Sequence, residues 1–290
     1  MKKLYVAVLL TVFNRKEVTL KGLASLFASI KKLPNHYLFD IYMTDDGCSD
    51  GTPEAVAIDY PNVKILKGNG NLYWGGGMNK AWNAALNSNI HYDYFLWFND
   101  DVILFEDALC ILFRHITEGY IITGAFHDME GVVSYGGKKK GGFLIEPNGS
   151  LQEVDLMNGN LVVISREVCD KLGIIDKRLI HGGGDYEYGL RAKSNGIGVY
   201  LAENYVGICN RHDAKIPKYC SKELTIHQRL KTLNSPIYNP YTHFYYNKMA
   251  HGILRACVNF AICYMGALLP SVYSFFKRVS TQIRAQNRCL

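Results

Sequence analysis

The stretch YFLWFNDDVILF, residues 94–105, places acidic residues inside an otherwise apolar run. Its first half is typical of a buried strand, and Asp100 and Asp101 follow directly after Asn99. Burying an ionised carboxylate without a partner costs several kcal/mol or more. We therefore expect the triplet either at the solvent-facing end of a strand or beside a cation. Taken alone, an acidic turn after a buried strand explains it equally well.

The residues around this run alternate between strand patterns and helical patterns. Apolar runs of strand length recur, and the segments between them carry apolar residues at helical spacing, such as Leu20, Leu23, Phe27 and Ile30. This alternation predicts an α/β fold with a Rossmann-like, mostly parallel central sheet flanked by helices. The predicted strands are 4–13, 37–47, 62–68, 93–101 and 120–126, and the predicted helices are 17–32, 52–60, 76–88 and 106–116.

The pattern changes at about residue 127, after which a glycine- and lysine-rich loop, GGKKKGGF, precedes further short elements. Strands are predicted at 158–165, 198–202 and 205–210, and helices after residue 166 and after the glycine run that ends at Gly184. The sequence thus predicts one body over residues 1–215, divided at 126/127, and a mainly helical tail over residues 216–290.

Composition places the chain among ordinary folded proteins. Its 290 residues are 48% hydrophobic and 20% charged, which excludes a disordered chain and leaves ample length for a core. The apolar run 4–13 is followed by Asn14-Arg15 without a small-residue cleavage site, so we interpret it as a buried strand rather than a secretion signal. Eight scattered Cys without a CxxC pair are typical of a reducing cytoplasm.

Three polar clusters follow predicted strands: TVFNR at 11–15, TDDGCSDGT at 44–52 and FNDD at 98–101. In an open α/β sheet, ligands bind at the carboxyl ends of strands. Each cluster alone is ordinary turn chemistry. Together they bring so many carboxylates to one edge that these should share a cation or a set of donors.

The stretch GNGNLYWGGGMNKAWNAAL, residues 68–86, is a glycine-rich turn that leads into a helix. Such a turn lets backbone approach a ligand and is expected to offer unpaired N–H groups to anionic oxygens. After Gly68 and Gly70, Tyr73 replaces the third glycine of the dinucleotide motif, and no Gly-Lys-Ser/Thr follows. Both common nucleotide folds are disfavoured, whereas a nucleotide diphosphate remains compatible.

The ordered motifs TVFNR, TDDGCSDGT, GNLYWGGGMNKAWN, FNDDV and GGGDYEYGLR resemble glycosyltransferase family 2 over roughly residues 4–215. This family comprises inverting nucleotide-sugar transferases with the GT-A fold. The chain is most similar to its bacterial surface-polysaccharide branch, which includes rhamnosyltransferases.

The resemblance implies a set of donor-binding roles. Thr11 and Asn14 would border the base and ribose, Asp45 or Asp46 would receive the pyrimidine edge, and Gly75 belongs to the glycine-rich turn beside the donor. FNDD occupies the position of the D-x-D motif, which makes Asp101 the ligand of Mg²⁺ or Mn²⁺ and places Asp100 near the ribose or a metal-bound water. Asn99 replaces the first acid and is still a hard oxygen donor.

The resemblance also implies that Asp185 is the catalytic base, although Gly184 replaces the acid that precedes it in the family. Glu187 is a competing carboxylate, and Arg191 would brace the site or face phosphate. The helix dipole at the start of this helix favours an ionised Asp185. Alternatively, Asp185 only caps the helix and Glu187 only pairs with Arg191, four residues later.

Two further residues are candidates for the site. His212 follows the last strands, where relatives place a histidine that reaches the metal, and a solvated or structural role is the alternative. Trp74 is a candidate for stacking on a sugar, whereas Trp97 within FLWF is expected in the core.

The tail is basic and apolar. Because the whole chain carries +6 and residues 224–290 carry eight basic residues without an acid, residues 1–223 carry −2. Residues 256–276 are an uncharged stretch long enough for a membrane span, but Pro270 and basic flanks on both sides disfavour one. We expect an interfacial helix pair on an anionic membrane surface. The alternative is a helix packed on the body or on a second subunit.

The predicted function is transfer of a sugar from a UDP- or dTDP-sugar to a glycan acceptor. A lipid-linked oligosaccharide in surface-polysaccharide synthesis fits the basic tail, which predicts a cytoplasmic protein at the inner face of the membrane. No nucleic-acid partner is predicted, and oligomers would form through the tail. A nucleotidyltransferase that makes nucleotide-sugars and an inactive transferase-like binding subunit are the alternatives.

Overall fold

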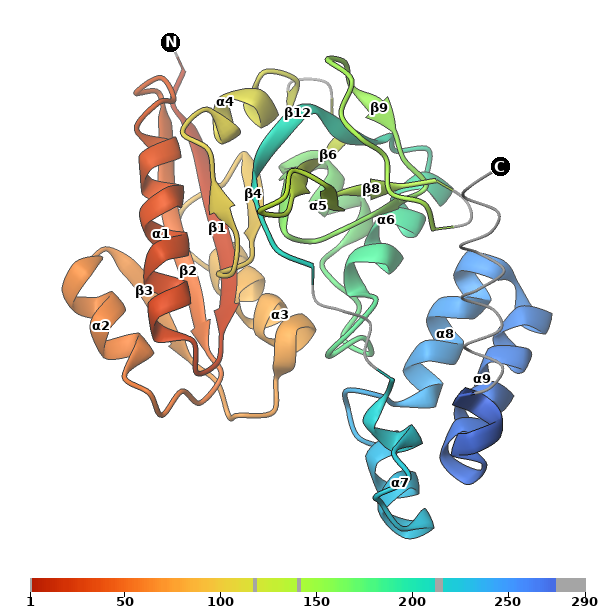
Figure 1. Ribbon diagram of the computed structural model, residues 1–290. Coiled ribbons are helices and arrows are strands. Elements are labelled where there is room, and N and C mark those ends of the chain that lie inside the picture. Colours follow the sequence, from red (N-terminus) through yellow and green to blue (C-terminus); the bar gives the residue numbers. More distant parts are fainter. Residues whose placement is uncertain (1, 117–118, 140–141, 212–215, 275–290) are drawn as a thin grey trace. The chain divides into compact units, whose positions relative to one another are not determined.

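The computed structural model describes residues 2–116, 119–139, 142–211 and 216–274. The chain divides into two compact units, Met1–Arg211 and His212–Leu290. The first unit is α/β and the second is helical (Figure 1).

The first unit is built on a mixed sheet with the strand order β3-β2-β1-β4-β11-β6-β12-β5. β1, β2, β3 and β4 run parallel to one another, as do β6 and β12, whereas β11 lies antiparallel between β4 and β6. The mostly parallel sheet predicted by the sequence is therefore confirmed. The strands are β1 (Leu4–Val12), β2 (Tyr37–Asp45), β3 (Val63–Lys67), β4 (Tyr94–Phe98), β5 (Ile103–Leu104), β6 (Ile121–His127), β7 (Val133–Tyr135), β8 (Gly137–Lys138), β9 (Gln152–Glu153), β10 (Leu156–Met157), β11 (Leu161–Ser165) and β12 (Val199–Ile208).

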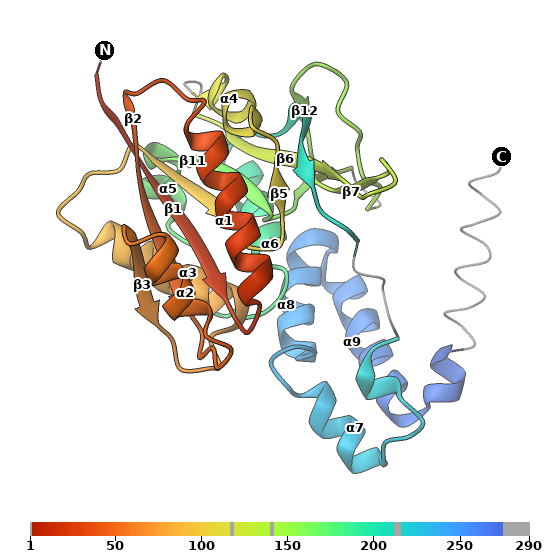
Figure 2. The same ribbon diagram turned by 60° about the vertical axis from the view of Figure 1, so that its left-hand side comes forward.

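Helices cover both faces of this sheet, so its central strands are buried on both sides. Alternate residues of β1 point to opposite faces: Val6, Val8 and Leu10 pack with α1, α2 and α4, while Ala7 and Leu9 pack with α3. Figure 2 shows α1 lying across β1. The helices are α1 (Lys16–Ile30), α2 (Thr52–Asp59), α3 (Tyr73–Leu86), α4 (Ala108–Phe113), α5 (Arg166–Leu172) and α6 (Gly184–Ser194).

The prediction of two short strands at 198–202 and 205–210 is wrong, because β12 is continuous from Val199 to Ile208. Its pairing with β6 shifts register between Leu201 and Tyr205 and again before Gly207. Such irregularities interrupt the side-chain alternation, so a bulged strand resembles two strands in sequence.

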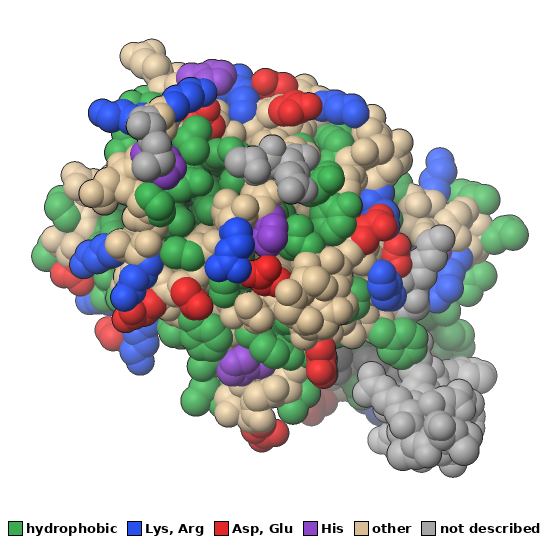
Figure 3. Space-filling view, turned by 90° about the horizontal axis from the view of Figure 1, so that it is seen from above, with side chains coloured by type: hydrophobic (Ala, Val, Ile, Leu, Met, Phe, Trp, Pro, Cys, Tyr) green, Lys and Arg blue, Asp and Glu red, His purple; other side chains and the backbone are tan. Residues whose placement is uncertain are grey.

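Acidic and basic side chains are interspersed with apolar ones over the face that Figure 3 draws. Ion pairs between exposed side chains also occur elsewhere on the first unit, such as Lys32–Glu106 at 2.8 Å and Arg166–Asp170 at 2.7 Å.

The helical unit contains the short 3-10 helix η2 (Lys218–Cys220) and the helices α7 (Ile226–Leu233), α8 (Pro240–His251) and α9 (Ile253–Leu268). Tyr219, Cys220, Leu233 and Ala267 form its small apolar core. Thr225 begins α7 with a capping box, because its hydroxyl accepts the N–H of Gln228 while the Gln228 side chain accepts the N–H of Thr225. In the part of the chain that the structure describes, no helix has the length and hydropathy needed to cross a bilayer.

Candidate active site

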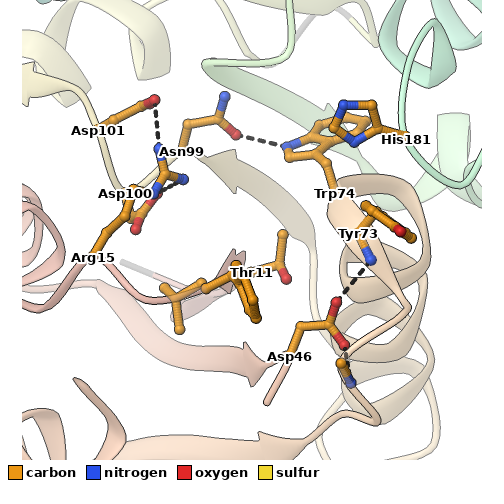
Figure 4. Close-up of a pocket in the computed structure, with 12 residues that line it drawn as sticks. Thr11, Arg15, Asp46, Tyr73, Trp74, Asn99, Asp100, Asp101 and His181 are labelled. Carbon is orange, nitrogen blue, oxygen red and sulfur yellow. Dashed lines mark hydrogen bonds and ion pairs between the residues drawn. The ribbon is translucent and has the colours of Figure 1, made fainter. Parts of the chain in front are cut away.

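A pocket of about 470 Å³, called the large pocket below, lies where the polar clusters follow β1, β2 and β4 (Figure 4). The strand register places these ends together, because Thr11 pairs with Thr44 and Leu9 pairs with Trp97. The expected clustering at the carboxyl edge of the sheet is thus present. The lining residues are Thr11, Val12, Phe13, Arg15, Asp46, Gly70, Tyr73, Trp74, Asn99, Asp100, Asp101 and His181.

Asp46 lines the large pocket with a carboxylate that the glycine-rich turn already binds. It accepts the N–H groups of Gly70 at 2.9 Å, Leu72 at 2.9 Å and Tyr73 at 2.8 Å. The expectation that this turn offers unpaired N–H groups to an anion is therefore wrong for these three residues. Their bonds also hold Tyr73 at a φ of 53°, a left-handed conformation that is unfavourable for a bulky residue.

Three residues expected to contact the nucleotide are absent from the described lining of the large pocket: Asn14, Asp45 and Gly75. Asn14 and Asp45 each accept a backbone N–H of the segment 48–49, in both cases at 2.7 Å. The N–H of Gly75 donates to the carbonyl of Ile180 at 2.6 Å, and a Cβ at Gly75 would collide with the neighbouring backbone. These residues hold the loops that shape the pocket.

Arg15 pairs with both acids of the segment 99–101, which follows β4 and is called the acidic tip below. Its Nη2 donates to Oδ1 of Asp100 at 2.5 Å, and its Nη1 donates to Oδ2 of Asp101 at 2.9 Å. The hydroxyl of Thr19 donates to the other oxygen of Asp100 at 2.7 Å. Figure 4 shows the guanidinium spanning both carboxylates. Arg15 thus supplies one positive charge beside FNDD, and the Mg²⁺ or Mn²⁺ expected at Asp101 stays a prediction.

Asp100 is the more buried of the two acids of the tip, since only 1% of its side chain is exposed, against 23% for Asp101. Burial raises the pKa of Asp100 to about 6, and the neighbouring Arg15 and the hydroxyl of Thr19 limit that rise. With both oxygens bound, Asp100 holds α1 against the tip, where the sequence expectation had placed it near the ribose or a metal-bound water.

The Asn99 side chain is held from two sides. Its Oδ1 accepts the indole N–H of Trp74 at 2.8 Å, and its Nδ2 donates to Oδ1 of Asn160 at 2.8 Å. The backbone N–H of Asn99 also donates to the carbonyl of Asn160 at 2.9 Å. Trp97 packs against Trp74 edge to face and is buried, as predicted for a core residue.

A second pocket of about 250 Å³, called the small pocket, shares Trp74, Asn99 and His181 with the large one. Its other lining residues are Gly159, Gly182, Gly183, Asp185 and Tyr186. The carboxylate of Asp185 thus faces a space that adjoins the large pocket.

Asp185 lies in the first turn of α6, after Gly183 with a φ of 79°. Its Oδ2 accepts the N–H of Gly159 at 3.0 Å, and its Oδ1 accepts the N–H of Tyr186 at 2.9 Å. Burial raises the pKa of Asp185, and these backbone hydrogen bonds oppose the rise. The helix start was expected to favour the ionised form of Asp185. The loss of hydration on burial has the larger effect and favours the protonated form. A raised pKa suits a group that accepts a proton near neutral pH.

Lys138 lies close enough to Asp185 for the two charges to interact. Its Nζ donates to the hydroxyl of Tyr186 at 2.7 Å, and burial lowers the pKa of Lys138 while Asp185 opposes that change. Tyr186 and Asp185 are sequence neighbours that both line the small pocket.

Glu187 and Arg191 pair with each other, as the alternative interpretation of this segment holds. The Arg191 guanidinium donates to both oxygens of Glu187, at 2.8 and 3.0 Å, and to the carbonyls of Leu172 and Ile174. Glu187 is only 1% exposed and does not line either pocket in the described structure. The expectation that Glu187 competes as a base, or that Arg191 faces phosphate, is contradicted by this geometry.

The expected metal ligand His212 lies outside the described residues. Within the described ranges, no three His, Cys, Asp or Glu side chains gather as a preformed metal site. Asp101, 23% exposed in the wall of the large pocket, is the accessible carboxylate of the tip.

Sequence reasoning missed Arg15, His181, Tyr186, Lys138 and Asn160. Arg15 stands inside the motif TVFNR, and the surplus of acids predicted some cation, so its role was accessible from the sequence. Tyr186 and His181 lie in or beside the motif GGGDYEYGLR, so their nearness to Asp185 was accessible too. Lys138 and Asn160 come from other segments, and nothing local to them indicates which partner they meet.

The sequence matches the family model described as Glycosyl transferase family 2 over residues 7–173. No curated protein matches the chain. Among solved structures, it is similar to the mannosyltransferase PcManGT from Pyrobaculum calidifontis in complex with GDP-Man and Mn²⁺, at 13% identity and a TM-score of 0.52, covering 97% of this chain and 80% of that one.

It is also similar to S. aureus TarS 1–349 in complex with UDP-GlcNAc, at 13% identity and a TM-score of 0.57, covering 92% of this chain and 79% of that one. At such identities the likeness shows the fold, which is that of GT-A glycosyltransferases. The matched family segment is more than half of the chain and contains the strands that carry the acidic tip. The chain therefore belongs to glycosyl transferase family 2.

Proposed function

We propose that the protein is an inverting, metal-dependent glycosyltransferase that moves a sugar from a UDP- or dTDP-sugar to a hydroxyl of a glycan acceptor. The observation that carries the proposal is the adjoining pair of pockets. The large pocket ends at the acidic tip of β4, and the small pocket holds Asp185, with Trp74, Asn99 and His181 common to both. A donor in one and an acceptor in the other would meet at these shared residues.

Asp185 is the proposed general base. Its carboxylate would accept the proton of the acceptor hydroxyl as that oxygen attacks the anomeric carbon from the side opposite the leaving nucleotide. The N–H groups of Gly159 and Tyr186 hold the carboxylate in place. Burial, which raises the pKa of Asp185, strengthens it as a proton acceptor.

The charges of the large pocket support a divalent cation. Among the described lining residues, Arg15 carries a positive charge, whereas Asp46, Asp100 and Asp101 are carboxylates. Two net negative charges would repel a diphosphate, so further positive charge is needed. Asp101 would hold Mg²⁺ or Mn²⁺, which bind proteins through one or two carboxylates together with phosphate oxygens. When bound, the cation neutralises charge on the departing nucleotide.

The proposed acceptor is a lipid-linked oligosaccharide in surface-polysaccharide synthesis, as in the rhamnosyltransferase-like branch. Leu254, Val258 and Ile262, four residues apart on α9, form an exposed apolar row called the α9 stripe. Residues 224–290 contain eight basic residues and no acid. An apolar stripe with basic surroundings fits attachment to the anionic inner face of a membrane. Association of two subunits through these helices is the competing role.

The test is product analysis with the full-length protein, a panel of UDP-, dTDP- and GDP-sugars, and lipid-linked acceptors, with and without EDTA. We expect release of a nucleoside diphosphate and glycosylation of the acceptor with inverted anomeric configuration. EDTA should abolish both, and Mn²⁺ or Mg²⁺ should restore them.

Other outcomes would identify the alternative functions. Formation of a nucleotide-sugar and pyrophosphate from a nucleoside triphosphate and a sugar phosphate would indicate a nucleotidyltransferase. Binding of nucleotide-sugars without turnover across the whole panel would indicate a binding subunit. Transfer that persists in EDTA would retain the transferase and exclude its metal dependence.

A further inference from the structure

We propose that Arg15 is a donor-binding residue that occupies the place of the divalent cation at Asp101 and passes to the donor diphosphate when the cation binds. The inference rests on the proposed function, because it names how one residue of the large pocket handles a metal-bound nucleotide. It assigns that residue a binding role of its own.

The two carboxylates that Arg15 bridges differ in burial, and therefore in the cost of losing Arg15 as a partner. Asp100 is 1% exposed, and its oxygens are bound by Arg15 at 2.5 Å and by Thr19 at 2.7 Å. Removing the partner of a buried charge is strongly unfavourable. Asp101 is 23% exposed, and a partly exposed pair of this kind contributes little. An incoming cation would therefore displace Arg15 from Asp101 and leave its bond to Asp100 intact.

The position of Arg15 in the large pocket fits the proposed second step, in which its guanidinium binds the donor diphosphate after leaving Asp101. Its side chain is 42% exposed, and it lines the pocket together with both acids. When Nη1 leaves Asp101, its N–H groups would become available to a ligand in the pocket while Nη2 stays on Asp100. Guanidinium N–H groups form strong charge-assisted bonds to phosphate oxygens.

The exchange makes cation and nucleotide depend on each other. A cation alone meets a carboxylate that Arg15 already neutralises, so it binds weakly. A nucleotide diphosphate supplies the new partner that Arg15 needs after leaving Asp101. Each ligand therefore increases the affinity for the other, as linkage requires.

A lysine could not perform both tasks in the same way. The observed guanidinium uses two nitrogens for two carboxylates, whereas a lysine ammonium is a single point charge. Arg15→Lys should keep the charge of the site and lose part of the coupling, and Arg15→Gln should lose both.

The experiment measures binding of Mn²⁺ by electron paramagnetic resonance, for the full-length wild type, Arg15→Gln and Arg15→Lys. Titrations are made with Mn²⁺ alone and with Mn²⁺ plus UDP, dTDP or GDP, against protein-free blanks. Arg166→Gln is the matched control, because Arg166 pairs with Asp170 on α5 and lines neither described pocket. Circular dichroism and thermal melts verify that each variant is folded.

We expect Arg15→Gln to bind Mn²⁺ alone about tenfold more tightly than the wild type and to bind nucleotide in saturating Mn²⁺ about tenfold more weakly. Arg15→Lys should fall between them, and Arg166→Gln should match the wild type. Unchanged or weaker binding of Mn²⁺ alone by folded Arg15→Gln, or unchanged nucleotide affinity, would overturn the role of Arg15. If the wild type itself binds all three nucleotides without any effect of Mn²⁺, the proposed metal dependence fails and this inference fails with it.

Discussion

The indole N–H of Trp74 donates to the side-chain carbonyl of Asn99 at 2.8 Å, and both residues line the large and the small pocket. The bond ties the start of α3 to the tip of β4 at the place where the two pockets meet. Removing this bond therefore tests whether both pockets contribute to the same reaction.

Replacing Trp74 with Phe keeps an aromatic ring and removes the N–H donor. We expect kcat/KM for transfer to fall about fivefold to tenfold, because one hydrogen bond contributes about 1 kcal/mol and Asn99 loses its orientation. Steady-state kinetics measure the effect. Trp82→Phe is the control, since Trp82 is a fully buried residue of α3 that lines neither described pocket, and its replacement should alter stability more than turnover. Equal kinetic losses in both variants would argue against a specific role of the Trp74 bond.

Asp185→Asn preserves shape and removes the proposed base. Turnover at saturating donor should drop about 10²- to 10⁴-fold, whereas nucleotide affinity, which our proposal assigns to the large pocket, should change little. Initial rates and isothermal titration calorimetry separate the two quantities. Asp170→Asn, at an exposed ion pair of α5, provides the comparison. Turnover near the wild-type value would remove Asp185 from its role.

The pH profile should carry the mark of a buried base. Because burial raises the pKa of Asp185, this carboxyl stays protonated to a higher pH than an ordinary aspartate, which titrates near 3.9. A protonated base cannot accept the hydroxyl proton, so kcat should rise with pH through that raised pKa. Measurements at saturating donor isolate this limb from titration of Asp100 at the donor side. An acid limb at the ordinary aspartate value would contradict the assignment.

Glu187→Gln tests whether the buried pair with Arg191 is structural. Removing one partner of a buried ion pair costs about 3 kcal/mol or more, because the other charge is left without compensation. We therefore expect a loss of about 3 kcal/mol in the free energy of unfolding, measured by urea denaturation. Turnover of the folded fraction should remain close to the wild type. A large loss of kcat without a loss of stability would restore Glu187 as a candidate base.

The α9 stripe is testable with lipid vesicles. Leu254→Asp combined with Val258→Asp should weaken co-sedimentation with vesicles that contain anionic lipid, and added salt should weaken binding of the wild type. Ile58→Asp is the matched control, because Ile58 is exposed on α2 of the other unit. If the wild type ignores anionic vesicles and instead sediments as a dimer that the double variant disrupts, the stripe serves subunit association.

The layered fold was accessible from the sequence because its signals are local. The apolar run 4–13 and the helical spacing of Leu20, Leu23 and Phe27 each belong to one element, and the acids 100–101 directly follow another. The antiparallel insertion of β11 between β4 and β6 was not accessible, since strand order depends on contacts between distant segments.

The same distinction separates the site residues. Motif order was sufficient for the family, which the comparison confirms. It did not reveal which donor binds which acid. Asp46 is bound by the turn after β3, and Asp100 is bound by Arg15, more than eighty residues earlier in the chain. Which buried acid meets which donor depends on packing, and local sequence patterns do not record it.

The turn at residues 158–160 connects the two halves of the site. Asn160 holds Asn99, Gly159 donates to Asp185, and a Cβ at Gly159 would press against the ring of Trp74. This short turn thereby separates Asp185 from the tip of β4. One inserted residue would change the separation of Asp185 from Asn99, and with it the room that the small pocket offers to a sugar in the proposed reaction.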